Sequence, residues 1–143
     1  MNLTEFQLVI GQTIMYCQLI ENDVKYIYTL MQRGDFDKNY EAVKLCTLGN
    51  TLRYLEELDN EDGHPYISQA DYDYLKKLAN RRNHWCHETF TCFMYEPEFL
   101  ESQEYKKECY KLNKDYVELK RVHEVLENIR VKLYNLRLKN RPN

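Results

Sequence analysis

The last part of the chain carries a long, uninterrupted helical pattern. From Glu98 to Asn140 there is no glycine and no proline. Two apolar series repeat there every seven residues: Leu112, Leu119, Leu126 and Leu133, and in the intervening register Val122, Ile129 and Leu136. A heptad sustained over this length is typical of a long helix packed at a shallow angle in a bundle or a coiled coil.

The length of this segment limits how it can pack. Roughly 40 residues at 1.5 Å per residue span about 60 Å, which exceeds the width of an ordinary small domain. We therefore expect one of two outcomes. Either the helix bends or breaks near Asn113–Asp115, or it extends beyond its own bundle and meets a partner.

Apolar spacing and turn residues predict three earlier helices. The first begins with Thr4 as N-cap and runs towards Arg33, where Gly34 ends it. The second covers roughly Tyr40 to Leu58. It has a stripe of leucines at Leu45, Leu48, Leu52 and Leu55, with Gly49 inside the helix.

A loop separates the second helix from the third. It covers Asp59 to Pro65, and Ser68 and Asp71 follow it as a capping box. The third helix ends before Pro97, which suits the first turn of the last helix. We predict an all-α fold, an antiparallel up-and-down bundle of four to five helices with a long C-terminal helix. Residues 1–143 form a single domain in this prediction.

Composition excludes several classes of protein. The chain has 143 residues, 43% of them hydrophobic and 30% charged, and a formal net charge of −3. A protein held to duplex DNA by its overall charge is usually basic, so any contact with nucleic acid needs a local patch. No apolar run approaches the roughly 20 residues of a membrane helix. The start has no signal-peptide pattern, so we expect no membrane partner and a cytoplasmic location.

The segment Arg82-Asn83-His84-Trp85-Cys86-His87 combines groups suited to work on a phosphodiester. An arginine fork can hold two phosphate oxygens. A histidine can take or give a proton near neutral pH. In a regular helix Asn83 and His87 share a face, whereas Arg82 lies about 140° from His87. His84 and Trp85 are expected to point elsewhere.

These residues resemble the motif of the HEPN superfamily, the small helical domains of prokaryotic toxins, abortive-infection systems and CRISPR effector ribonucleases. That motif is an arginine, four to six intervening residues and a histidine, often with asparagine after the arginine. Arg82, Asn83 and His87 match it with four intervening residues. Arg81 offers a second register, and we prefer Arg82 because Asn83 then occupies the polar position.

The resemblance implies a metal-independent endoribonuclease without a cofactor, acting as a toxin or a phage-defence effector. In the family, two motif copies face each other across a homodimer axis. His87 would be the acid or base at the ribose 2′-OH or the leaving 5′-oxygen. Arg82 would bind the scissile phosphate, and Asn83 would orient either group. The product would be a 2′,3′-cyclic phosphate on RNA, and an antitoxin or regulatory protein is a possible further partner.

One position departs from a branch of the family. In the branch paired with nucleotidyltransferase antitoxins, a tyrosine that the antitoxin modifies follows two positions after the histidine. This chain has Thr89 there. Control by modification of that tyrosine is therefore not expected.

A small basic cluster adjoins the motif. Lys76, Lys77 and Arg81 lie next to Arg82 in an otherwise acidic chain. One interpretation is that these residues guide the RNA backbone. The other is an ordinary solvated helix face.

Two further alternatives concern function and metal binding. A non-catalytic HEPN-like helical dimer, binding protein or nucleic acid, would also explain the long heptad. His84, Cys86, His87 and Cys92 include possible zinc ligands, but their spacing matches no common structural zinc site. The sequence therefore predicts no metal site.

Overall fold

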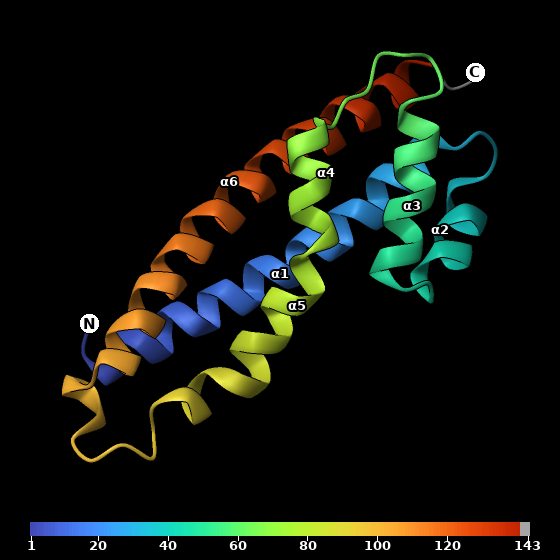
Figure 1. Ribbon diagram of the computed structural model, residues 1–143. Helices are drawn as coiled ribbons and strands as arrows, with labels where there is room; N and C mark the ends of the chain where they lie inside the picture. Colours follow the sequence, from blue (N-terminus) through green and yellow to red (C-terminus); the bar gives the residue numbers. More distant parts are fainter. Residues whose placement is uncertain (141–143) are drawn as a thin grey trace. The chain divides into compact units, whose positions relative to one another are not determined.

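The computed structural model describes residues Met1–Asn140, and all regular structure in this range is helical (Figure 1). The elements are α1 Leu3–Met31, α2 Phe36–Lys44, α3 Leu48–Asp59, α4 Gln69–Lys76, α5 Leu78–Asn83, the π-helical turn η1 His84–Glu88, the 3₁₀ turns η2 Thr89–Cys92 and η3 Phe99–Glu101, and α6 Gln103–Lys139. The described chain is therefore an all-α helical bundle with a long C-terminal helix, as predicted. None of the helices in this range has the length and apolar character needed to cross a membrane.

The first helix begins earlier than its predicted cap. Asn2 Oδ1 accepts the Glu5 N–H at 2.8 Å, and Glu5 Oε2 accepts the Asn2 N–H at 3.0 Å. This reciprocal pair satisfies two donors at the helix start, so Asn2 and not Thr4 is the N-cap. At the other end Gly34 has a φ of 101°, a backbone conformation that glycine adopts without steric cost.

The segment predicted as one helix from Tyr40 to Leu58 forms two helices, α2 and α3, so the prediction of a continuous helix was wrong. The chain leaves α2 after Lys44, and Thr47 starts α3 by accepting the Asn50 N–H at 3.2 Å. Leu45 lies at this break and is 91% exposed, so it does not belong to the buried leucine stripe. Gly49 lies in the first turn of α3 and not in a helix interior.

The predicted third helix is also interrupted. Ser68 Oγ accepts the Asp71 N–H at 3.2 Å, which confirms the predicted cap at the start of α4. The helix then divides at Lys77 into α4 and α5, and η1 and η2 follow α5. The motif segment thus ends in a π turn and a 3₁₀ turn, where the sequence predicts regular helix.

The long helix α6 is continuous, whereas one of our two expectations was a bend or break near Asn113–Asp115. α6 has 37 residues, and Asn113–Asp115 lie inside it (Figure 1). It starts at Gln103, where Ser102 Oγ accepts the Tyr105 N–H at 3.1 Å. Pro97 lies in the preceding turn region, so its predicted place in the first turn of the last helix was wrong.

The chain divides into two compact units, and each contains parts of α1 and α6. Unit 1 comprises Met1–Gln18 and Lys77–Arg121, and unit 2 comprises Leu19–Lys76 and the residues from Val122 on. That residues 1–143 behave as one domain stays a prediction.

Unit 1 is organised around aromatic side chains. Its buried core contains Phe6, Ile10, Trp85, Phe93, Tyr105 and Leu112. Here α1 and α6 run in the same direction. Two contacts in sequence order show this: Tyr105 Oη donates to the Met1 carbonyl oxygen at 2.7 Å, and further along both helices Tyr16 packs against Tyr116. Each fully buried apolar side chain contributes on the order of 2 kcal/mol. This core holds the motif segment against α6.

Unit 2 has an aliphatic core and a buried carboxylate. The core includes Ile20, Val24, Ile27, Leu52, Leu55, Val122 and Leu126. Asp59, at the end of α3, accepts the Tyr66 N–H at 2.8 Å, the Ile67 N–H at 3.1 Å and the Tyr72 hydroxyl at 2.7 Å. One side chain therefore satisfies donors in the loop and in α4.

Candidate functional site

The three predicted catalytic residues lie at the junction of α5 and η1 in unit 1. Arg82 and Asn83 are the last two residues of α5, and His87 belongs to η1. The Asn83 and His87 side chains are exposed, and Arg82 is half-buried. The junction thus offers an amide and an imidazole to solvent, beside an arginine.

The motif segment ends in a π turn. The Thr89 N–H donates to the His84 carbonyl oxygen, a bond that joins residues five apart. His87 lies inside this turn and Arg82 precedes it in α5, so the angle of about 140° that a regular α-helix sets between them does not apply. π turns of this kind occur often at functional sites.

Trp85 anchors the turn to α6. It is 2% exposed, and its Nε1–H donates to Asp115 Oδ2 at 2.9 Å. The other carboxylate oxygen, Asp115 Oδ1, accepts from Arg81 Nη1 at 2.9 Å. Both Asp115 oxygens thus hold the motif segment. Trp85 is therefore a core residue of unit 1.

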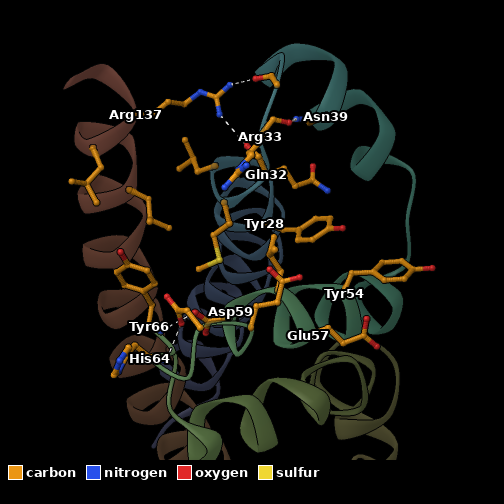
Figure 2. Close-up of a pocket in the computed structure, with 18 of the residues that line it drawn as sticks. Tyr28, Gln32, Arg33, Asn39, Tyr54, Glu57, Asp59, His64, Tyr66 and Arg137 are labelled. Carbon is orange, nitrogen blue, oxygen red and sulfur yellow. Dashed lines mark hydrogen bonds between the residues drawn. The ribbon is translucent and has the colours of Figure 1, made fainter. Parts of the chain in front are cut away.

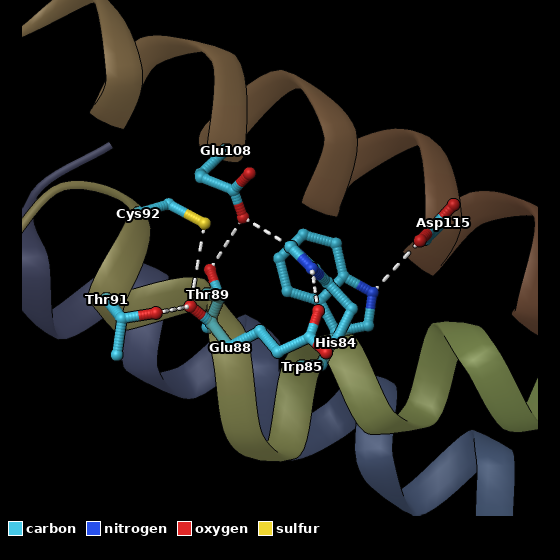
Figure 3. Close-up of polar contacts among 8 residues, drawn as sticks. All are labelled: His84, Trp85, Glu88, Thr89, Thr91, Cys92, Glu108 and Asp115. Atoms are coloured by element: carbon cyan, nitrogen blue, oxygen red, sulfur yellow. Dashed lines mark hydrogen bonds and ion pairs between the residues drawn. The ribbon is translucent and has the colours of Figure 1, made fainter.

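The side chain of His84 lies between two carboxylates (Figure 3). Its Nε2 is 2.6 Å from Glu108 Oε2, and its Nδ1 is 3.3 Å from Glu88 Oε2. Thr89 Oγ1 donates to the same Glu108 oxygen at 2.8 Å. Both ring nitrogens of His84 are therefore within hydrogen-bond distance of a carboxylate oxygen.

Cys92 is the third polar side chain around Glu108. Its Sγ donates to the Glu88 carbonyl oxygen at 3.5 Å (Figure 3). Partial desolvation, and then the charge of Glu108, raise the pKa of the Cys92 thiol. Ligand atoms of His84, Cys92 and Glu108 all lie within 4.8 Å of one another, and we call these three residues the His84 cluster.

The predicted RNA-binding residues have different surroundings. Lys77 is exposed at the start of α5. Arg81 is bound to the buried Asp115, as described above. Lys76 belongs to unit 2, where its Nζ is 2.8 Å from Glu56 Oε2. Within the described chain, Lys77 is the lysine of this group with no ion pair, and all three stay predicted RNA contacts.

A second cluster of titratable groups lies in unit 2, formed by Asp23, His123, Glu127 and Arg130, which we call the Asp23 cluster. His123 Nδ1 is 3.0 Å from Asp23 Oδ2, and Arg130 Nε is 3.9 Å from Asp23 Oδ1. Arg130 also forms a close ion pair with Glu127. Burial, and then the Glu127 charge, raise the pKa of Asp23 to about 6, whereas the Arg130 hydrogen bond lowers the pKa of Glu127.

Unit 2 also contains a wide pocket of about 1190 Å³ (Figure 2). Side chains that line it include Tyr28, Tyr54, Glu57, His64, Tyr66 and Arg137. Arg137 donates to the Gln32 and Gly34 carbonyl oxygens at 3.4 and 2.6 Å, so its guanidinium stabilises the end of α1. None of the predicted site residues lines this pocket.

The carboxylates on α6 were missed, although the sequence contains a signal for them. Glu108 and Asp115 precede Val122 and Ile129 in one series of seven-residue steps. Both acids are buried, at 8% and 4% exposure. Acidic residues at core positions of a heptad need buried partners, because an unpaired buried charge is costly. His84, Thr89, Trp85 and Arg81 are those partners.

Comparison of the chain with protein-family models, with curated proteins and with solved structures finds no match.

Proposed function

We propose that this protein is a metal-independent endoribonuclease of HEPN type, acting in the cytoplasm as a toxin or phage-defence effector. The observation that supports the proposal is that Arg82, Asn83 and His87 lie at the junction of α5 and a π turn, with the Asn83 and His87 side chains exposed. A phosphate oxygen and a ribose hydroxyl can reach exposed groups of this kind without unfolding the core.

Each residue has a defined part in the proposed reaction. His87 removes the proton from the ribose 2′-OH or delivers one to the leaving 5′-oxygen. Arg82 holds the non-bridging phosphate oxygens through its planar fork and stabilises their developing charge. Asn83 orients the phosphate or His87. Attack by the 2′-oxygen forms a 2′,3′-cyclic phosphate and releases a 5′-OH strand, so the substrate is RNA.

A second copy of the chain completes the proposed site. One imidazole does not readily serve as acid and base in a single step, whereas two copies at a two-fold axis divide these roles. Exposed Lys77 lies at the start of the same helix as Arg82 and is the side chain best placed to attract the RNA backbone. Arg81 is bound to Asp115 and Lys76 to Glu56, and both remain predicted contacts of the RNA backbone.

Buried Thr89 bears on control of this activity. Its hydroxyl donates to Glu108, and the residue is 1% exposed. A modifying enzyme reaches such a hydroxyl only if the turn opens. The proposal therefore includes an antitoxin or regulatory protein that acts by binding, and no modification at this position.

The test is cleavage of a labelled RNA in EDTA by wild-type protein and the His87→Ala and Arg82→Ala variants. We expect each variant to lose at least about 100-fold in rate. His64→Ala is the matched control, because His64 is an exposed histidine in the loop of unit 2. Activity that persists in both motif variants, or no cleavage of any RNA by a folded wild-type dimer, contradicts the proposal.

One observation favours a non-catalytic dimer or binding module as the second candidate. On α6, Tyr110 and Val117 are seven residues apart and are 74% and 62% exposed. In unit 2 the same spacing recurs with Val131 and Leu138, at 44% and 43%. Exposed apolar residues at heptad spacing suit a helix partner. A Tyr110→Lys, Val117→Lys variant that remains a dimer in sedimentation would contradict this use of the helix.

A further inference from the structure

The His84 cluster brings together three kinds of metal-binding atom from three elements of unit 1. His84 Nε2 comes from η1, Cys92 Sγ from η2 and the Glu108 carboxylate from α6. These atoms lie within 4.8 Å of one another. Imidazole nitrogen, thiolate sulfur and carboxylate oxygen are the ligands that Zn²⁺ takes, and three protein ligands with one open position are typical of its non-structural sites.

The surroundings of the cluster match those of a metal-binding histidine. His84 Nδ1 faces Glu88 Oε2 at 3.3 Å, so a carboxylate can hold the ring while Nε2 faces the cluster. Thr89 Oγ1 fixes Glu108 Oε2 from the other side at 2.8 Å. Metal-bound histidines almost always have such a partner on the second nitrogen, and it sets both tautomer and ring orientation.

The His84 cluster and the Asp23 cluster differ in which side chains pair with their carboxylates. In the Asp23 cluster, Arg130 binds Glu127 and approaches Asp23, so an arginine already lies among the carboxylates. No arginine or lysine forms an ion pair with Glu88 or Glu108 among the described residues, where His84 is the partner that the two carboxylates share. A metal ion can therefore approach Glu108 without displacing an arginine or a lysine.

We propose that His84 Nε2, Cys92 Sγ and the Glu108 carboxylate bind one Zn²⁺ ion, with water at the fourth position. This site is separate from the Arg82, Asn83 and His87 chemistry and does not depend on ribonuclease activity. It joins η1 and η2 to α6, and so it clamps the π turn in place.

Binding requires a small, defined rearrangement. Ligand atoms around tetrahedral Zn²⁺ are roughly 3.3–3.8 Å apart. The contact of 2.6 Å between His84 Nε2 and Glu108 Oε2 must therefore lengthen by about 1 Å. In the bound form His84 binds through a deprotonated Nε2 and keeps Nδ1–H for Glu88. Cys92 loses its thiol proton to solvent and gives up its bond to the Glu88 carbonyl oxygen.

The experiment is a titration of the reduced, chelator-treated full chain with Co²⁺, followed by competition with Zn²⁺. We expect one equivalent of Co²⁺ to produce a thiolate charge-transfer band in the near ultraviolet, which one equivalent of Zn²⁺ removes. Cys92→Ser should lose this band and weaken Zn²⁺ binding at least about 100-fold. Cys92 is exposed, so circular dichroism should show an unchanged fold.

Matched variants identify the ligands. Cys86→Ser is the control, because Cys86 is exposed on the same segment and lies outside the cluster. It should leave the band and the affinity unchanged, as should His123→Asn in the Asp23 cluster. Glu108→Gln should weaken binding about 10-fold or more.

Any of the following results overturns the proposal: no charge-transfer band in wild-type protein, a band that survives Cys92→Ser, or a band that depends on Cys86. Zn²⁺ binding in the His87→Ala variant keeps the two proposals apart. Retained binding there supports the metal site even if RNA cleavage is never observed. The metal-site proposal is also overturned if His87→Ala abolishes Zn²⁺ binding while His84→Asn leaves Zn²⁺ binding unchanged.

Discussion

The His84 cluster and the Asp23 cluster use similar groups but balance their charges differently. Both place a histidine against a buried carboxylate, with contacts of 2.6 Å to Glu108 and 3.0 Å to Asp23. In unit 2, Arg130 supplies a permanent cation and Asp23 still has a pKa raised to about 6 by burial. In unit 1 the histidine faces two carboxylates and a cysteine lies beside them.

The comparison separates a structural ion-pair network from a candidate binding site. In the Asp23 cluster an added cation would have to displace Arg130 from its carboxylates. In the His84 cluster no arginine or lysine among the described residues pairs with Glu108, so a metal ion displaces no such side chain. Cys92 adds a soft ligand to the His84 cluster, whereas the Asp23 cluster has no thiol.

Glu108→Ala should have the largest effect on stability. It removes the acceptor of His84 and Thr89 inside unit 1, and hydrogen bonds to a charged group contribute about 1.5–3 kcal/mol each. We expect the free energy of unfolding to fall by about 3 kcal/mol in urea denaturation. Glu118→Ala, which breaks an exposed pair with Arg121, should cost less than about 1 kcal/mol. Equal losses in the two variants would contradict a structural role for Glu108.

Asp23 should make stability depend on pH in a defined window. Its folded pKa of about 6 lies above the ordinary value of 3.8 for an aspartate, so the folded protein keeps a proton that the unfolded chain has lost. The Asp23 contribution to stability therefore decreases as pH rises from about 4 to about 6, by on the order of 2 kcal/mol. Denaturation of wild type and Asp23→Asn across this range should converge at low pH; parallel curves would refute the assignment.

Arg130→Met tests whether the arginine is what completes the Asp23 cluster. Arg130 is partly exposed, so the free energy of unfolding should fall by about 1–2 kcal/mol. The variant should also gain Zn²⁺-dependent thermal stabilisation that depends on His123. Arg121→Met is the control and should show neither change. An Arg130→Met variant whose thermal stability does not change with Zn²⁺ would contradict the idea that Arg130 keeps a metal ion out of the Asp23 cluster.

Glu88→Gln should have the smallest effect on stability. Glu88 is exposed and pairs with His84 one turn away, an interaction that contributes about 0.3–0.5 kcal/mol. Zn²⁺ affinity, in contrast, should fall about 10-fold, because the amide holds the ring less strongly. Calorimetry measures both quantities on the same protein. A stability loss above about 1 kcal/mol with unchanged affinity would reverse the role given to Glu88.

The sequence predicted the long helix because its apolar spacing and its lack of glycine and proline are local properties. Leu112, Leu119 and Leu126 are all buried on α6, as the heptad requires. The helix boundaries were less well predicted. The break at Leu45–Thr47 has no glycine or proline, and the cap of Thr47 on the Asn50 N–H is what ends one helix and starts the next.

The candidate site was predicted only in part, since its geometry depends on contacts across the unit. The segment from Arg82 to His87 was recognised from its residues, but nothing local in it predicts a π turn. That turn depends on Trp85 and Arg81 meeting Asp115 on α6. Glu108 was the missing ligand beside His84 and Cys92, and sequence spacing alone does not show which face of α6 the motif segment covers.

The chemistry of the RNA ends tests the proposed ribonuclease reaction at His87 most directly. An RNA cleaved by wild-type protein in EDTA, with an RNA carrying 2′-deoxy sugars throughout as control, should be examined by mass spectrometry. We expect 2′,3′-cyclic phosphate and 5′-OH ends, no cleavage of the 2′-deoxy control, and no products with His87→Ala. Ends with a 3′-OH, or cleavage of the 2′-deoxy strand, would contradict it.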